Sequence, residues 1–276
     1  MPRPTSIKFI INPTIFALLF AAAAGAAAQE APSSGAQKGK SSAGDPLREA
    51  QDSAKRAMSS NNLKQISLGL LNFVSARKRF PPAAIRDKDG KPLLSWRVAI
   101  LPYIEQNDLY KEEFHLDEPW DSDHNKALLA KMPAVFRSPF DDPKSTNASY
   151  FMPTSTGMLA EGDQGKRVRD ITDGMSRTIM LIEAKRDIPW TKPEDIEIDT
   201  DPAKPLPKIG FPQAGDLFAV AFADGSIHRV ADTIDPKLLR AMLTVAGGET
   251  IPIDVMSQTV LGREEPKPGS GEPPQR

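Results

Sequence analysis

The sequence of 276 residues contains no cysteine and only three histidines, and these absences exclude several kinds of site. Without cysteine the chain has no thiol nucleophile, iron–sulfur cluster, cysteine zinc site or disulfide. The histidines show neither a His-x3-His nor a His-Glu-x-x-His spacing, as zinc enzymes require. Gly-x-Ser-x-Gly elbows and Gly-rich phosphate loops are also missing. We therefore expect no catalytic site and no bound cofactor, with calcium as the one exception considered below.

The chain also lacks a large excess of charge of either sign, since its formal net charge is −1. Such a chain has no excess of basic residues to attract nucleic acid, so we expect no nucleic-acid partner. The 26 prolines fall mostly between the apolar segments, which predicts long loops. Without its two ends the chain keeps roughly 220 residues, enough for one domain with a buried core.

Residues 1–28 have the pattern of a secretory signal peptide. Arg3 and Lys8 precede an apolar stretch over residues 10–24, and three alanines end at Ala28. Signal peptidase requires small residues at these last positions, so we expect cleavage after Ala28 and a periplasmic or extracellular protein. The alternative is an uncleaved anchor, and the chain would then contact the membrane only through this segment.

The segments next to both ends have the composition of flexible chain. Residues 29–45 are rich in Ser, Gly, Ala and Lys, and residues 264–276 contain four prolines and two glycines. Neither segment has enough apolar surface to offset the entropy lost on ordering. We expect a linker at 29–45, a disordered tail at 264–276 and one domain over residues 46–263.

A long amphipathic helix is predicted at the start of this domain. Asp45 and Pro46 provide an N-cap and a proline at the first helical position, and no strong breaker follows before about Lys78. Residues 47–58 have a thinner apolar stripe, so this half should project or pack weakly, and a break is possible at residues 59–61. Apolar residues at spacings of three and four mark the packed face: Leu63, Ile66, Leu70, Phe73 and Val74.

The rest of the domain changes from helices to strands. Shorter helices are predicted at residues 95–103 with a continuation at 107–110, at 125–132 and at 236–245. Strands are predicted at residues 149–152, 179–184, 217–223 and 226–230, with turns at 87–90 and at Asp224-Gly225. This order predicts an α+β fold in which the long N-terminal helix packs on an antiparallel sheet, with long Pro-rich loops.

Seven sequence blocks together suggest a family. They are Ser60–Ile66, Phe80–Ala83, Leu94–Val98, Leu101–Gln106, Leu116–Ser122, Asp170–Ser176 and Phe222–Ser226. In this order they resemble the pseudopilin-like proteins of domain of unknown function 1559, also called the His-x9-Asp-Gly or prepilin-type processing-associated family. The resemblance covers roughly residues 55 to 247. It implies a pseudopilin-like fold, in which a long N-terminal helix packs on an antiparallel sheet, and no established activity.

Two features depart from this family. Its members commonly begin with a prepilin leader, in which a Glu lies a few residues into a long apolar helix, and no such Glu interrupts the apolar run here. We therefore do not expect the chain to polymerise through that helix. The family's histidine ten residues before an Asp-Gly turn is replaced by Ala214.

An acidic loop is the candidate metal site. Asp117, Glu118, Asp121 and Asp123 offer oxygen ligands at short spacing, beside His124, and Ca²⁺ takes six to eight such ligands. The alternative is that residues 118–123 supply turn residues and the N-cap of the helix that starts near Asn125. The spacing does not match an EF-hand loop, because the sixth position lacks Gly.

Two functions remain open after these observations. The first is an exported, non-enzymatic, pseudopilin-like domain that binds or scaffolds an unidentified envelope protein or glycan. The second is an exported hydrolase or carbohydrate-binding protein with carboxylates such as Asp117, Asp121, Asp173 and Asp224 in its loops. Five aromatic residues would then form a sugar-stacking platform, although their irregular spacing favours core packing: Trp96, Trp120, Trp190, Tyr103 and Tyr110.

Overall fold

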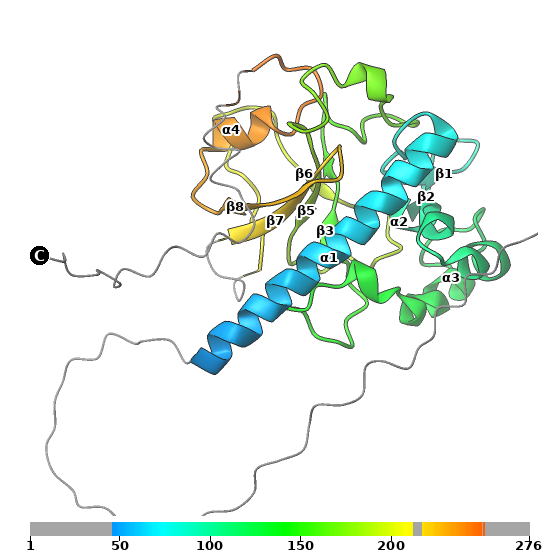
Figure 1. Cartoon of the computed structure of the whole chain (residues 1–276). Helices are drawn as coiled ribbons and strands as arrows, with labels where there is room; N and C mark the ends of the chain where they lie inside the picture. The colour runs from blue at the N-terminus through cyan, green and yellow to red at the C-terminus, as the bar shows by residue number, and fades with distance from the viewer. Residues whose placement is uncertain (1–45, 212–216, 250, 252–276) are drawn as a thin grey trace, which may run out of the picture. The chain divides into compact units, whose positions relative to one another are not determined.

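The computed structural model describes residues 46–211, 217–249 and 251 (Figure 1). The expected signal peptide, linker and C-terminal tail lie outside these residues, as do Asp45 and Ala214. No helix in the described ranges combines the length and the apolar character needed to cross a membrane.

The first element is helix α1, Pro46–Arg77, which is 32 residues long and has no break. Ser60 is tolerated inside the helix because its hydroxyl donates to the carbonyl of Arg56, one turn earlier, at 3.1 Å. Burial begins at Ser59 and repeats every three or four residues up to Val74. Residues 46–58, by contrast, are mostly exposed and extend beyond the sheet (Figure 1). The predicted contrast between the two halves of this helix is therefore confirmed.

A four-stranded antiparallel sheet forms the second layer. Its strands are β3 (Tyr150–Phe151), β5 (Ile179–Glu183), β7 (Leu217–Phe222) and β8 (Ile227–Ala231), in the order β3-β5-β7-β8. Every residue of β5 is buried, as expected of a strand covered on both faces. Strands β7 and β8 form the predicted Asp-Gly hairpin, and Gly225 supplies the positive φ of 83° that the turn requires.

The packed half of α1 lies across this sheet. Leu63, Ile66 and Leu70 are fully buried in a core that they share with β5 and β7. At the hairpin, the Lys64 ammonium donates to the Gly225 carbonyl at 2.8 Å. The predicted α+β fold, with the long helix packed on an antiparallel sheet, is confirmed.

Small elements connect and flank the two layers. They are β1 (Ala84–Arg86), β2 (Pro92–Ser95), α2 (Trp96–Ala99), η1 (Leu101–Tyr103), η2 (Leu109–Glu113), α3 (Asp123–Ala127), η3 (Leu128–Lys131), η4 (Ala134–Phe136), β4 (Pro153–Thr154), η5 (Val168–Asp170), β6 (Ile196–Glu197) and α4 (Pro236–Ala241). The turn predicted at residues 87–90 joins β1 and β2, which pair antiparallel. Strands β4 and β6 pair in parallel over only two residues each, too short for a sequence pattern.

Several predicted boundaries were wrong. The helix expected over residues 95–103 is divided into α2 and the 3-10 helix η1, with Pro102 in the first turn of the second piece, where its missing N–H is not needed. The helix expected over residues 125–132 begins earlier, at Asp123, and its second half is the 3-10 helix η3. The last helix ends at Ala241 instead of continuing to residue 245.

Candidate functional site

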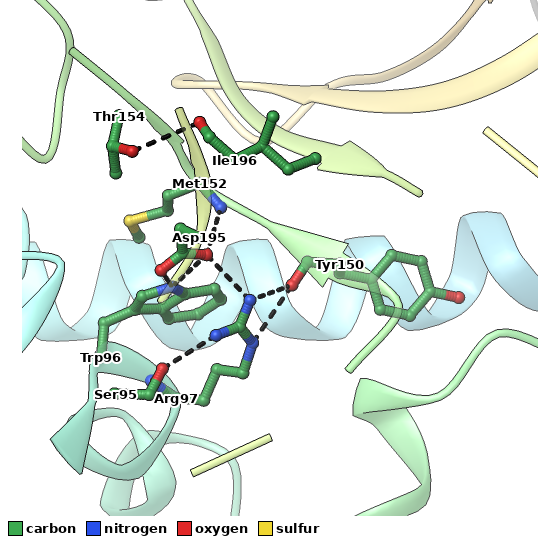
Figure 2. Close-up of polar contacts among 8 residues, drawn as sticks. All are labelled: Ser95, Trp96, Arg97, Tyr150, Met152, Thr154, Asp195 and Ile196. Atoms are coloured by element: carbon green, nitrogen blue, oxygen red, sulfur yellow. Dashed lines mark hydrogen bonds and ion pairs between the residues drawn. The ribbon is translucent and has the colours of Figure 1, made fainter. Parts of the chain in front are cut away.

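The most concentrated polar chemistry of the described chain surrounds Arg97, the second residue of α2. Strand β2 ends in Ser95, whose hydroxyl accepts from the Arg97 backbone N–H at 3.3 Å and caps the short helix. This cap turns the chain so that the Arg97 side chain enters the core, where the residue has no exposed surface. Figure 2 shows the guanidinium between Ser95, Tyr150 and Asp195.

The groups around the guanidinium are hydrogen-bond acceptors and aromatic rings, which stabilise its positive charge. It donates to the Ser95 hydroxyl at 2.8 Å, to the Tyr150 carbonyl at 2.8 and 3.2 Å, and to the Asp195 carboxylate at 2.8 Å. It also lies 4.7 Å from the ring centre of Trp96 and 4.8 Å from that of Phe151. Such cation–π contacts strengthen when water is excluded.

The Asp195 carboxylate is surrounded by donors. Besides Arg97, it accepts from the Trp96 indole N–H at 3.0 Å and from the Met152 backbone N–H at 3.0 Å (Figure 2). Burial raises the pKa of Asp195 and lowers the pKa of Arg97, and the pairing of the two opposes both shifts. Because all of these partners donate, they favour the ionised carboxylate facing a charged guanidinium.

This arrangement holds distant segments together. Arg97 and Asp195 are 98 residues apart, and the pair joins α2 to the backbone of β3 and to the loop before β6. Their side chains are 0% and 1% exposed, so no substrate reaches the charges. The site is a buried internal ion pair, and its geometry fits a structural task.

A second buried carboxylate, Glu183, lies where α1 meets the sheet. It accepts from the hydroxyls of Ser59 at 2.5 Å and Ser138 at 2.8 Å, and the Ser59 hydroxyl also lies 3.0 Å from the Tyr150 hydroxyl. Burial raises the pKa of Glu183, and the hydroxyl hydrogen bonds, the Ala219 backbone N–H and the charge of Arg229 oppose that rise. Burial, together with the negative charge of Glu183, also raises the pKa of Tyr150.

The acidic loop is organised by an amide. Asn125 is buried, and its side-chain amide donates to the carbonyls of His115, Glu118 and Pro119 at 2.8 to 3.2 Å. Ser122 caps α3 by accepting from the Asn125 N–H at 3.1 Å, so the interpretation as turn and N-cap is confirmed.

The calcium prediction gains no support from this geometry. Asp117, Asp121 and Asp123 are exposed, and Glu118 binds the His115 imidazole at 2.8 Å, which lowers the pKa of Glu118. Among the residues that the structure describes, no group of three His, Asp or Glu side chains is placed to hold a metal ion. Calcium binding stays a prediction.

The two Asp-Gly carboxylates accept different hydrogen bonds, Asp173 from a distant segment and Asp224 within its own turn. Asp173 accepts from the backbone N–H groups of Gly247 and Gly248 at 2.7 and 3.0 Å. Asp224 accepts from the Ser226 N–H at 2.9 Å and from its hydroxyl. The acidic loop lies beside α3, on the other side of α1 from the β7–β8 strands (Figure 1). Asp117 and Asp121 therefore lie apart from Asp224, whereas the turns that carry Asp173 and Asp224 are joined by a hydrogen bond from the Asp224 N–H to the Met175 carbonyl at 3.2 Å.

The aromatic and histidine candidates are also dispersed. Trp96 and Trp190 are fully buried, as the core-packing interpretation predicts, whereas Trp120 is only partly buried. His115 and His124 stack at 3.5 Å between ring centres, beside the acidic loop. His228 lies elsewhere, against the Phe222 ring.

The roles of Arg97, Asp195 and Glu183 as buried charged residues were not predicted from the sequence. Glu183 had a usable signal, because a charged residue inside the apolar run 179–184 requires a buried partner. Arg97 lies in one of the family-like blocks, but nothing in the sequence indicated that its side chain is buried. Asp195 stands among several acidic residues of a Pro-containing loop and had no distinguishing signal.

Comparison with known proteins gives one positive finding. Neither the curated proteins nor the solved structures include a match to this chain. Residues 48–157 match a family model described as protein of unknown function (DUF1559). This range contains nearly all of α1, the β1–β2 hairpin, Arg97 and β3. The predicted resemblance to this family is therefore confirmed over residues 48–157, and the two blocks at 170–176 and 222–226 lie outside the matched range.

Proposed function

We propose that this protein is an exported, non-enzymatic, pseudopilin-like domain that binds or scaffolds another component of the bacterial cell envelope. The observation that carries the proposal is the division of α1 into a packed half and a projecting half. Residues 59–74 anchor the helix to the sheet, and residues 46–58 extend from it as an exposed helical surface. A rigid helix held at one end presents its other end to a partner without paying the entropy of ordering.

The buried polar groups support a binding role over catalysis. The Arg97–Asp195 pair is closed to solvent, and Glu183 is occupied by two hydroxyls. Asp117 and Asp121 lie in a different loop from Asp173 and Asp224, and the last two carboxylates already accept backbone hydrogen bonds. Within the projecting half, Met58 is 57% exposed and offers an apolar contact to a partner.

Site-specific photo-crosslinking in the envelope tests the proposal. A photoreactive amino acid at Met58 should give a crosslinked product of defined mass. The same group at Lys126, an exposed residue of α3, serves as the control. A product at position 58 that is absent at position 126 supports the proposal. Equal products at both positions, or none at either, would contradict it.

Export is tested separately on the mature chain. N-terminal sequencing of the protein recovered from the envelope fraction should begin at Gln29. A chain that begins at Met1, or one found only in the cytoplasm, would contradict this part of the proposal.

A further inference from the structure

Two basic segments that are far apart in the sequence meet at the C-terminal end of α1. A shallow hollow of about 510 Å³ lies between the last turn of the helix and η5. Its lining combines three cationic side chains with a hydroxyl and two valines, and contains no acidic residue: Val74, Ser75, Lys78, Arg167, Val168 and Arg169. The fold therefore gathers positive charge that the sequence distributes over 90 residues.

Part of this charge is not neutralised within the described chain. Arg167 donates its Nε and one terminal nitrogen to Asp170, both at 3.0 Å, and Arg169 lies 4.0 Å from the same carboxylate. These contacts lower the pKa of Asp170 to about 2 and raise the pKa of Arg167. Lys78 has no carboxylate partner in the described ranges, so three cations share one carboxylate.

The helix dipole explains only a fraction of this charge. The negative end of a helix corresponds to about half an elementary charge, which one lysine or arginine compensates. Arg77 already lies in the last turn of α1 and supplies that charge. The further cations of the hollow, of which Arg169 lies in η5 and Arg167 directly precedes it, exceed what the dipole requires.

The backbone of Lys78 gives a second, independent observation. Its φ is 63°, in the left-handed region that favours glycine, and its N–H donates to the Val74 carbonyl at 2.7 Å as the helix ends. Glycine is the usual residue at this position after a helix, and other residues are strained there. Because the backbone conformation alone favours glycine, a lysine at this position indicates that its side chain has a role of its own.

We propose that this hollow binds a phosphate group. Arginine guanidinium groups and a lysine ammonium are the side chains that recognise phosphate oxygens, and the Ser75 hydroxyl adds a neutral donor. The exposed guanidinium of Arg169 and the ammonium of Lys78 supply the charge, while Arg167 is held in place by Asp170. The phosphate belongs either to a lipid headgroup or to a small soluble anion. The site is independent of the surface proposed on residues 46–58.

The test measures binding to two probes by the full purified chain. Titration calorimetry with inorganic phosphate addresses the soluble anion, and flotation with phosphatidylglycerol vesicles, against phosphatidylcholine vesicles, addresses the lipid. We expect binding to at least one probe, weakened by added salt. Lys78→Gly and Arg169→Gln should each weaken it about tenfold, as loss of a charge-assisted hydrogen bond does. Lys126→Gln, on α3, should leave it unchanged.

Lys78→Gly separates binding from folding. Glycine suits the left-handed position, so the thermal midpoint of this variant should equal or exceed that of the parent chain. Loss of phosphate binding by a variant of undiminished stability would establish the site. Absence of binding to both probes, or an equal loss in the Lys126→Gln control, would overturn it.

Discussion

Two carboxylates, Asp195 and Glu183, are buried in the described part of the chain, and they are compensated in different ways. Asp195 faces a guanidinium at 2.8 Å, whereas Glu183 faces the neutral hydroxyls of Ser59 and Ser138. Burial raises the pKa of both acids, but only Asp195 has a full opposite charge in direct contact. The charge on Arg229 acts on Glu183 without a direct ion pair. The difference teaches that two equally buried carboxylates make the stability of the fold depend on their partners and on pH in different ways.

The largest effect is expected when the charged partner of Asp195 is removed. Arg97→Met keeps much of the side-chain volume but leaves a buried carboxylate without its guanidinium. Breaking a buried pair in this way costs about 3–5 kcal/mol of unfolding free energy. Urea unfolding followed by circular dichroism measures the loss.

Arg177→Met is the matched control, because Arg177 is exposed. Its effect should stay within about 0.5 kcal/mol. A loss for Arg97→Met no larger than that of the control would contradict the role of the pair.

A smaller effect is expected for the hydroxyls around Glu183. Ser59→Ala removes a 2.5 Å hydrogen bond to this carboxylate and should cost about 1.5–3 kcal/mol. Ser67, on the same helix, is also buried, but its hydroxyl has no hydrogen-bond partner in the described structure. Ser67→Ala should therefore be neutral or stabilising. Equal losses for the two variants in urea unfolding would show that helix packing, and not Glu183, sets the cost.

The smallest change, seen mainly as a pH dependence, is expected for Glu183→Gln. The raised pKa means that the protonated Glu183 stabilises the fold fully below pH 4.5, the ordinary value, and that this contribution is lost as pH rises through the folded-state pKa. The groups facing Glu183 include Tyr150, whose pKa is also raised, and Arg229, beside Arg56. The glutamine variant should match the parent near pH 4.5 and become relatively more stable at higher pH.

Thermal melts from pH 4 to pH 8 measure this difference. Parallel curves for Glu183→Gln and the parent chain would show that the titration of Glu183 is not coupled to folding.

The sequence predicted those parts of the fold that follow local patterns. Helix α1 has apolar residues at the helical period. Strands β5, β7 and β8 are short apolar or β-branched runs bounded by Gly, Asp and Pro, and the Asp-Gly turn marks the hairpin. Strands β4 and β6 have two residues each and carry no period. Their pairing is determined by tertiary contacts, which a local pattern does not contain.

The candidate sites were less predictable for the same reason. Hydrophobic periodicity gave the buried face of α1 but not the contact of Ser59 with Glu183, 124 residues away. The acidic composition of the loop indicated a metal site, yet the shape of the loop depends on hydrogen bonds from the amide of Asn125. A count of charges does not indicate which charges the fold will bury.

A double-mutant cycle on Arg97 and Asp195 tests most directly the central claim that this buried ion pair holds distant segments of the fold together. The single variants are Arg97→Met and Asp195→Asn, and unfolding free energies are compared with that of the double variant. We predict that the double variant loses less than the sum of the singles, with a coupling of about 2 kcal/mol or more, because neither charge is left alone. Additivity within about 0.5 kcal/mol would contradict the claim.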